Sequence, residues 1–143
     1  MIESQAQILS EYRLKKAMDL LTQSELLLSN QRYDGSINRS YYAIFNAVRS
    51  VLALVSIDSR SHQGVMSYFD RYFVKPGIFE KNFSKIIHSA FDTRQDNDYE
   101  DFYVPSEADA LDQYNNAILF IREIEQKRKL FISGELPLPV INQ

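Results

Sequence analysis

The chain has 143 residues, of which 45% are hydrophobic and 24% charged, and its formal net charge is −3. These values are typical of one folded domain and exclude a disordered or low-complexity chain. Cysteine is absent and only two histidines are present. Disulfides, thiolate metal sites and cysteine nucleophiles are therefore excluded, and we expect neither a metal nor a cofactor. The acidic balance argues against a broad basic surface for nucleic acid, but a local cationic groove stays compatible with it.

No segment of the sequence predicts contact with a membrane. The first five residues lack the basic and apolar regions of a signal peptide, and no apolar run approaches the roughly 18 residues of a membrane span. The absence of cysteine fits a reducing compartment. Together these observations predict a cytoplasmic protein.

Four glycines and four prolines divide the chain into long segments with helical periodicity. The segments predict five helices, over residues 5–30, 36–57, 61–74, 78–97 and 106–132. We therefore predict an all-α protein, an up-and-down bundle of four to five helices. Residues 1–132 are expected to form a single domain and residues 133–143 an extended C-terminal tail.

Two short signals mark predicted helix starts. Ser4-x-x-Gln7 and Ser106-x-x-Asp109 have the form of capping boxes. In such a box the two side chains reciprocally satisfy backbone N–H groups at the helix start. They place the starts of the first and last helices close to residues 5 and 106.

The helix predicted over residues 36–57 is apolar around most of its circumference. We expect it to be the central, mostly buried helix, with Phe45, Val48 and Leu52 in the core. Its polar residues collect on one narrow stripe, which contains Asn38, Arg39, Tyr42, Asn46, Arg49 and Ser50. Such a stripe either lines a cleft or is the one solvated face of the helix, and the pattern leaves both interpretations open.

The helix predicted over residues 78–97 carries charges on its apolar face. Arg94 and Asp98 lie one turn apart on the same side as Ile87 and Phe91. Because an unpaired buried charge is costly, these two residues need partners. They either pair with each other and stabilise the end of the helix, or serve a function at the edge of the bundle or at a dimer interface. Buried charge pairs contribute little to stability, so we favour a function.

The two histidines are weaker candidates. His62 follows Ser61 at the start of the helix predicted over residues 61–74, where we expect it to cap that helix or contact a neighbouring one. His88 is expected on the outer, solvated face of the fourth helix. Neither position by itself indicates catalysis.

Several segments together resemble a known family. Residues 38–49, Asn-Arg-Ser-Tyr-Tyr-Ala-Ile-Phe-Asn-Ala-Val-Arg, are similar to the second helix of HEPN (higher eukaryotes and prokaryotes nucleotide-binding) domains. Residues 61–65 (Ser-His-Gln-Gly-Val), 72–75 (Tyr-Phe-Val-Lys) and 94–99 (Arg-Gln-Asp-Asn-Asp-Tyr) follow in the order seen in one bacterial and archaeal branch of that family. The resemblance covers about residues 8–131.

The resemblance implies an up-and-down bundle that commonly forms homodimers. Many HEPN proteins are ribonuclease toxins or toxin-like proteins, paired with a small nucleotidyltransferase. Their metal-independent site has an Arg and a His separated by four to six residues, at the dimer cleft. Arg94 matches the Arg, but the possible His positions hold Tyr99, Glu100 and Asp101. The branch resembled here has Arg-x-x-x-Asp-Tyr at this place, which makes Asp98 and Tyr99 the candidate catalytic partners of Arg94.

The two helical patterns and the resemblance predict one site. We expect three arginines to converge on a cleft, with four other residues nearby, which gives the set Arg39, Arg49, Arg94, Tyr42, Asn46, Asp98 and Tyr99. Unmatched guanidinium charge would suit a phosphate.

Three functions follow from these predictions. The first is a non-catalytic HEPN module that binds a nucleotide or RNA phosphate, or a partner nucleotidyltransferase, within a toxin–antitoxin-type system. The second is a metal-independent endoribonuclease toxin that uses Arg94. The third is a structural homodimer without a ligand. The missing His favours the first, because His is the natural group to move protons at a reacting phosphate.

Overall fold

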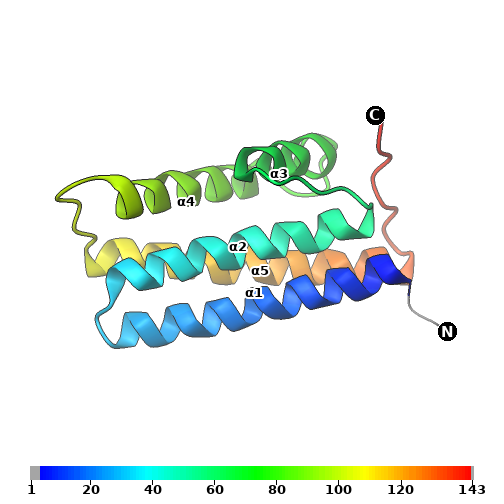
Figure 1. Cartoon of the computed structure of the whole chain (residues 1–143). Coiled ribbons are helices and arrows are strands. Elements are labelled where there is room, and N and C mark those ends of the chain that lie inside the picture. The colour runs from blue at the N-terminus through cyan, green and yellow to red at the C-terminus, as the bar shows by residue number, and fades with distance from the viewer. Residues whose placement is uncertain (1–3, 143) are drawn as a thin grey trace.

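The computed structural model describes residues 4–142, and these residues fold as a bundle of helices (Figure 1). The elements in chain order are α1 (Gln5–Ser29), α2 (Tyr33–Leu54), α3 (His62–Phe69), the short π-helix η1 (Asp70–Val74), α4 (Lys81–Tyr99) and α5 (Glu107–Ser133). The predicted all-α class is confirmed, and residues 4–142 contain no strand. None of the helices in this range is both long enough and apolar enough to cross a membrane.

Both predicted capping boxes are present. The Gln7 N–H donates to Ser4 Oγ over 3.1 Å, and the Ser4 N–H donates to Gln7 Oε1 over 3.3 Å. The Asp109 N–H donates to Ser106 Oγ over 3.1 Å, and the Ser106 N–H donates to Asp109 Oδ2 over 3.2 Å. These contacts satisfy backbone donors at the starts of α1 and α5, which explains why both starts could be predicted.

The middle helices differ from their predicted bounds. The second was expected over 36–57 but spans Tyr33–Leu54. It ends earlier because Ser56 adopts a left-handed backbone, with φ of 57°. The third was expected to be one helix over 61–74. It is α-helical only to Phe69 and then widens into η1, where the Lys75 N–H donates to the Asp70 carbonyl, five residues back, over 2.8 Å.

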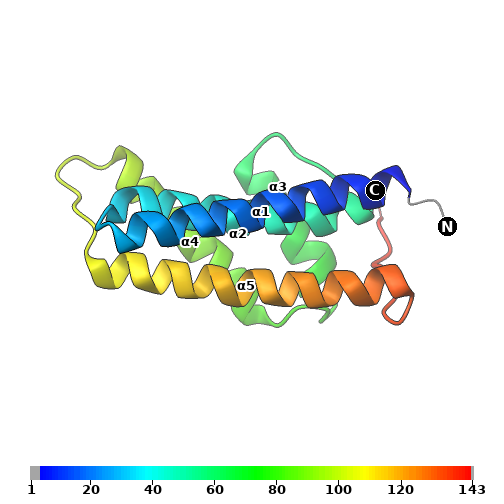
Figure 2. The ribbon, with the colours of Figure 1, turned by 90° about the horizontal axis from the view of Figure 1, so that it is seen from below.

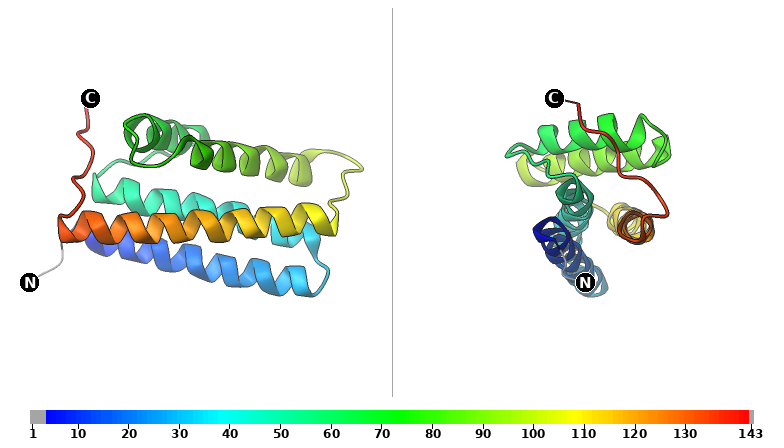
Figure 3. Two further views of the ribbon diagram at one scale, coloured as in Figure 1. Left: turned by 180° about the vertical axis from the view of Figure 1, so that it is seen from behind. Right: turned by 90° about the vertical axis from the view of Figure 1, so that its right-hand side faces the viewer.

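α2 is the central helix, as predicted. It packs against α1, α3, α4 and α5. In the views from front and back, α3 and α4 cover one side of α2 and α1 covers the opposite side (Figures 1 and 3). Val48 and Leu52 have no exposed surface and Phe45 is 8% exposed. α2 therefore presents a different face to each neighbour, and its polar residues lie between helices rather than on one free surface.

The C-terminal tail crosses the end of the bundle where α1 begins and α2 ends (Figures 2 and 3). Leu136 and Ile141 pack against the core. The Tyr72 hydroxyl donates to the Asn142 carbonyl over 2.6 Å. The tail is therefore packed on the helices through contacts at both of its ends.

Candidate ligand site around Arg94

The site lies where the C-terminal half of α4 passes α2. Arg94 Nη2 donates to the Tyr42 hydroxyl over 2.9 Å, and Nε lies 3.0 Å from Asp98 Oδ2. The Arg94 side chain is 13% exposed and that of Asp98 is 27% exposed. Nε is buried and is not aligned for a hydrogen bond to that carboxylate. The ion pair therefore holds the guanidinium in place without occupying all of its donors.

Three tyrosine rings surround the Arg94 guanidinium. Its central carbon lies 5.3 Å from the ring centre of Tyr42 and 5.7 Å from those of Tyr41 and Tyr99. At these distances the electron-rich ring faces attract the cation. Tyr99 is 70% exposed, so one of the three rings is open to a ligand. The structure thus brings together Arg94, Asp98, Tyr99 and Tyr42 from the predicted set.

Arg39 and Arg49 lie elsewhere, which corrects the prediction that three arginines converge. Ten residues of α2 separate them, or about 15 Å along the axis. Arg39 reaches toward α1, where its Nε donates to Gln23 Oε1 over 3.2 Å. Arg49 instead forms an ion pair with Asp58, over 3.2 Å, beyond the end of α2. Asn46 is buried, and its Nδ2 donates to the Tyr42 carbonyl over 2.8 Å.

The Arg49 partner belongs to a separate charged cluster. Asp58 Oδ2 also lies 3.1 Å from Nη2 of Arg13, which is buried. Burial alone would raise the pKa of Asp58, but hydrogen bonds from Arg49 and the Ser59 N–H, with the charges of both arginines, lower it overall. Burial and the charge of Arg49 lower the pKa of Arg13. This cluster joins α1, α2 and the connection to α3, and Asp58 offsets one of its two arginine charges.

His62 is a neighbour of the candidate site that the sequence interpretation missed. Its Nδ1 lies 2.6 Å from the Tyr41 hydroxyl, and its ring stacks on Phe45 with centres 4.5 Å apart and planes 22° apart. The ring centres of Tyr42 and Phe91 lie 5.8 and 6.1 Å from the ring centre of His62. Burial and the charge of Arg94 lower the pKa of His62. The imidazole is therefore a close neighbour of Arg94, contributed by a third helix.

The expected contact of His62 with a neighbouring helix is thus present, but its place beside Arg94 could not be read from residues 61–65. The available signal was the similarity of that segment to the family pattern. The other histidine, expected on a solvated face, is half-exposed and has a partner, because His88 Nε2 lies 2.7 Å from Asp70 Oδ2.

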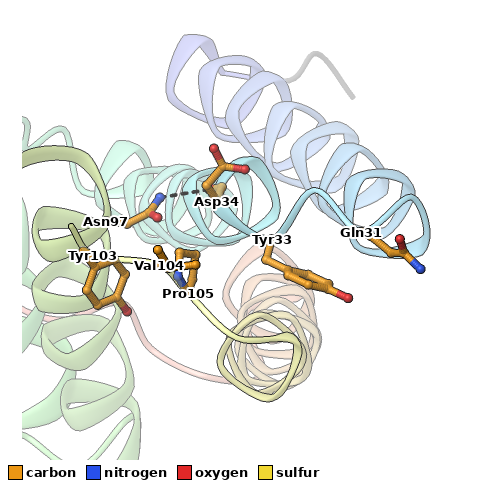
Figure 4. A pocket seen from close by; sticks show the side chains of 7 residues that line it. All are labelled: Gln31, Tyr33, Asp34, Asn97, Tyr103, Val104 and Pro105. Carbon is orange, nitrogen blue, oxygen red and sulfur yellow. Dashed lines mark hydrogen bonds between the residues drawn. The ribbon is translucent and has the colours of Figure 1, made fainter. Parts of the chain in front are cut away.

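A cavity of about 360 Å³ lies at the end of the bundle where α2 begins and α4 ends (Figure 4). Asn97 Nδ2 donates to the Asp34 carbonyl over 3.0 Å at its edge, and Tyr33, Tyr103 and Pro105 line it. Its described lining contains an aspartate and no lysine or arginine. This chemistry does not suit a phosphate, and Arg94 is the candidate position for an anion.

Comparisons with known proteins agree with this all-α fold. The family model of the HEPN domain matches residues 10–127. The "UPF0332 protein" of Thermotoga maritima is 33% identical to this chain over 116 residues, which cover 81% of the chain and 88% of that protein. A second relative, "UPF0332 protein PH1297" of Pyrococcus horikoshii, is 38% identical over 85 residues, or 59% of the chain and 60% of that protein.

A third relative has a name that concerns function. It is "Putative toxin MJ0605" of Methanocaldococcus jannaschii, 29% identical over 113 residues, which cover 79% of this chain and 84% of that protein. The match to most of the chain and the similarity to these proteins define its class. The chain belongs to the HEPN domain family.

Proposed function

We propose that this chain is a HEPN binding module that takes a phosphate group of a nucleotide or RNA at Arg94. The observation that supports this proposal is the partly enclosed guanidinium with donors left over. Arg94 Nη2 is bound to Tyr42, while Nη1 has no protein partner in residues 4–142. A guanidinium fork matches the geometry of a phosphate, and a base can stack on the exposed Tyr99 ring.

The absence of an imidazole at positions 99 to 101 favours binding over cleavage. Residues 99 to 101 offer a phenol and two carboxylates, and none of them is a neutral-pH proton donor and acceptor like His. Metal-independent RNA cleavage is a second candidate function, because His62 lies beside Arg94. Incubation of the protein with a labelled single-stranded RNA in excess chelator distinguishes the two, since binding alone leaves the RNA intact.

The module is proposed to act with other protein chains in a toxin–antitoxin-type system. The name of the Methanocaldococcus relative supports this context. We propose a homodimer and a partner nucleotidyltransferase. Phe102 and Val104 offer a contact surface, since they are 101% and 84% exposed in the connection between α4 and α5. Apolar side chains gathered at an exposed place are typical of interfaces.

Calorimetry with a short single-stranded RNA tests the binding function. We expect Arg94→Ala to abolish binding and to leave the fold intact, whereas Arg122→Ala, which removes an exposed arginine of α5, should bind like the wild type. A structural dimer without a ligand predicts the opposite pattern. In that case the wild type binds nothing at millimolar RNA, and Arg94→Ala is strongly destabilised because Asp98 loses its partner.

A further inference from the structure

The hydrogen bond between Tyr41 and His62 has a definite direction. Tyr41 has no exposed surface, so its hydroxyl hydrogen must find an acceptor inside the protein. Nδ1 of His62, 2.6 Å away, is the acceptor that residues 4–142 provide. Burial raises the pKa of Tyr41, so the hydroxyl keeps its hydrogen. We therefore assign the Tyr41 hydroxyl as the donor and His62 Nδ1 as the acceptor.

The direction of this hydrogen bond determines which nitrogen of the His62 imidazole carries the hydrogen. With Nδ1 accepting, a neutral ring carries its hydrogen on Nε2. No described residue forms a hydrogen bond with Nε2, which leaves this N–H free for a ligand. The titratable groups that face the ring are Tyr41 and Tyr42 from α2 and Arg94 from α4. None of them is a carboxylate that would stabilise a second proton on His62.

We propose that Tyr41 holds His62 as a neutral Nε2–H donor beside Arg94, and that the site therefore takes the singly charged phosphodiester inside an RNA strand in preference to the doubly charged terminal phosphate of a mononucleotide. This inference rests on the proposed function and specifies its substrate class. Tyr41 is a positioning residue, because it acts on the ligand through His62.

The charges of the site support this preference. Arg94 is the one cation among these groups, Asp98 lies 3.0 Å from it and offsets part of its charge, and His62 adds a donor without adding charge. A terminal phosphate has its second pKa near 6, so it carries close to two negative charges above pH 7. A second negative charge would meet Asp98 without a second cation to balance it. A phosphodiester has one negative charge and two free oxygens, which match one guanidinium and one neutral N–H.

Binding of two small probes tests the preference. At pH 7.5 we expect the dinucleotide adenylyl-3′,5′-adenosine to bind the wild type about tenfold more tightly than AMP. Asp98→Asn removes the compensating charge and should strengthen AMP binding by about tenfold, which reduces or reverses the preference. Asp101→Asn, at an exposed position further along the same acidic run, is the matched control and should leave the ratio unchanged.

Nitrogen NMR of the imidazoles tests directly how Tyr41 acts on His62. In the wild type we expect His62 in the Nε2–H form and titrating below the ordinary histidine pKa of 6.5. Tyr41→Phe should give a mixture of the two neutral forms, raise the pKa of His62 and weaken dinucleotide binding. His62→Gln, which keeps an N–H donor, should retain more dinucleotide affinity than His62→Ala. His88, paired with Asp70, is the internal control and should not change.

The outcomes separate this inference from the proposed function. If the wild type binds neither probe, the proposed function fails. If it binds AMP as tightly as the dinucleotide, or if His62 carries its hydrogen on Nδ1, binding at Arg94 stands and this inference is overturned. If Tyr41→Phe does not fold, two measurements still test the inference. They are the position of the hydrogen on His62 in the wild type and the ratio of dinucleotide to AMP affinity in Asp98→Asn.

Discussion

Arg13 of α1 and Asp58 of the connection between α2 and α3 form an ion pair with 3.1 Å between Nη2 and Oδ2. The same carboxylate oxygen lies 3.2 Å from Nη2 of Arg49, and Arg13 Nη1 donates to the Arg49 carbonyl over 3.1 Å. The Asp58 carboxylate thus links α1 to the C-terminal part of the central helix α2. Arg13 is 7% exposed, so its charge depends on this partner.

Replacement of Asp58 should therefore destabilise the fold. We expect Asp58→Ala to lower the free energy of unfolding by about 1–3 kcal/mol, below the full cost of breaking a buried pair because the Asp58 side chain is half-exposed. Urea unfolding measures the change. Asp101→Ala, at an exposed position, is the control and should have little effect. An unchanged midpoint in Asp58→Ala would show that the two arginines do not need the carboxylate.

The same cluster predicts a loss of stability in acid. The pKa of Asp58 is lower in the folded protein than its ordinary value of 3.8. Its contribution to stability is therefore fully present above about pH 4 to 5 and is lost as the pH falls through the folded pKa. Urea midpoints measured from pH 7 to pH 3 should fall more steeply for the wild type than for Asp58→Asn. Parallel curves for the two proteins would contradict the prediction.

Leu52 tests the central position of α2. Its side chain has no exposed surface, and truncation leaves a cavity between helices. We expect Leu52→Ala to cost about 2–5 kcal/mol of unfolding free energy, measured by urea or thermal unfolding. Leu26→Ala removes a leucine that is 65% exposed and should change stability by less than about 0.5 kcal/mol. Equal effects of the two variants would be incompatible with the observed core.

A homodimer is expected in solution. The exposed Phe102 and Val104 lie close together in the chain, a few residues after Arg94, and pairing of identical surfaces is the commonest way to cover such side chains. Sedimentation at micromolar concentration should give about 33 kDa, twice the 16.7 kDa chain. Phe102→Ser should shift the equilibrium toward the monomer. A wild type that sediments at 16.7 kDa under these conditions would refute the prediction.

Local sequence signals determined the fold class and the starts of the first and last helices. Capping boxes, breaker residues and the apolar face of residues 36–57 act within a few turns of one helix, so they predicted the all-α bundle, the central helix and its core residues Phe45, Val48 and Leu52. The end of α2 and the widening at η1 could not be predicted in this way, because no glycine or proline lies at either place.

The site was decided by tertiary structure. The sequence alone showed that Arg94 and Asp98 lie one turn apart on an apolar face, and this pair is present. The sequence did not indicate where the long side chains of Arg39 and Arg49 point, because their partners Gln23 and Asp58 come from other segments. His62 reached the site for the same reason. A histidine at a helix start becomes a neighbour of an arginine 32 positions later only when α3 and α4 pack on the same side of α2, and such contacts leave no periodic pattern in a single sequence.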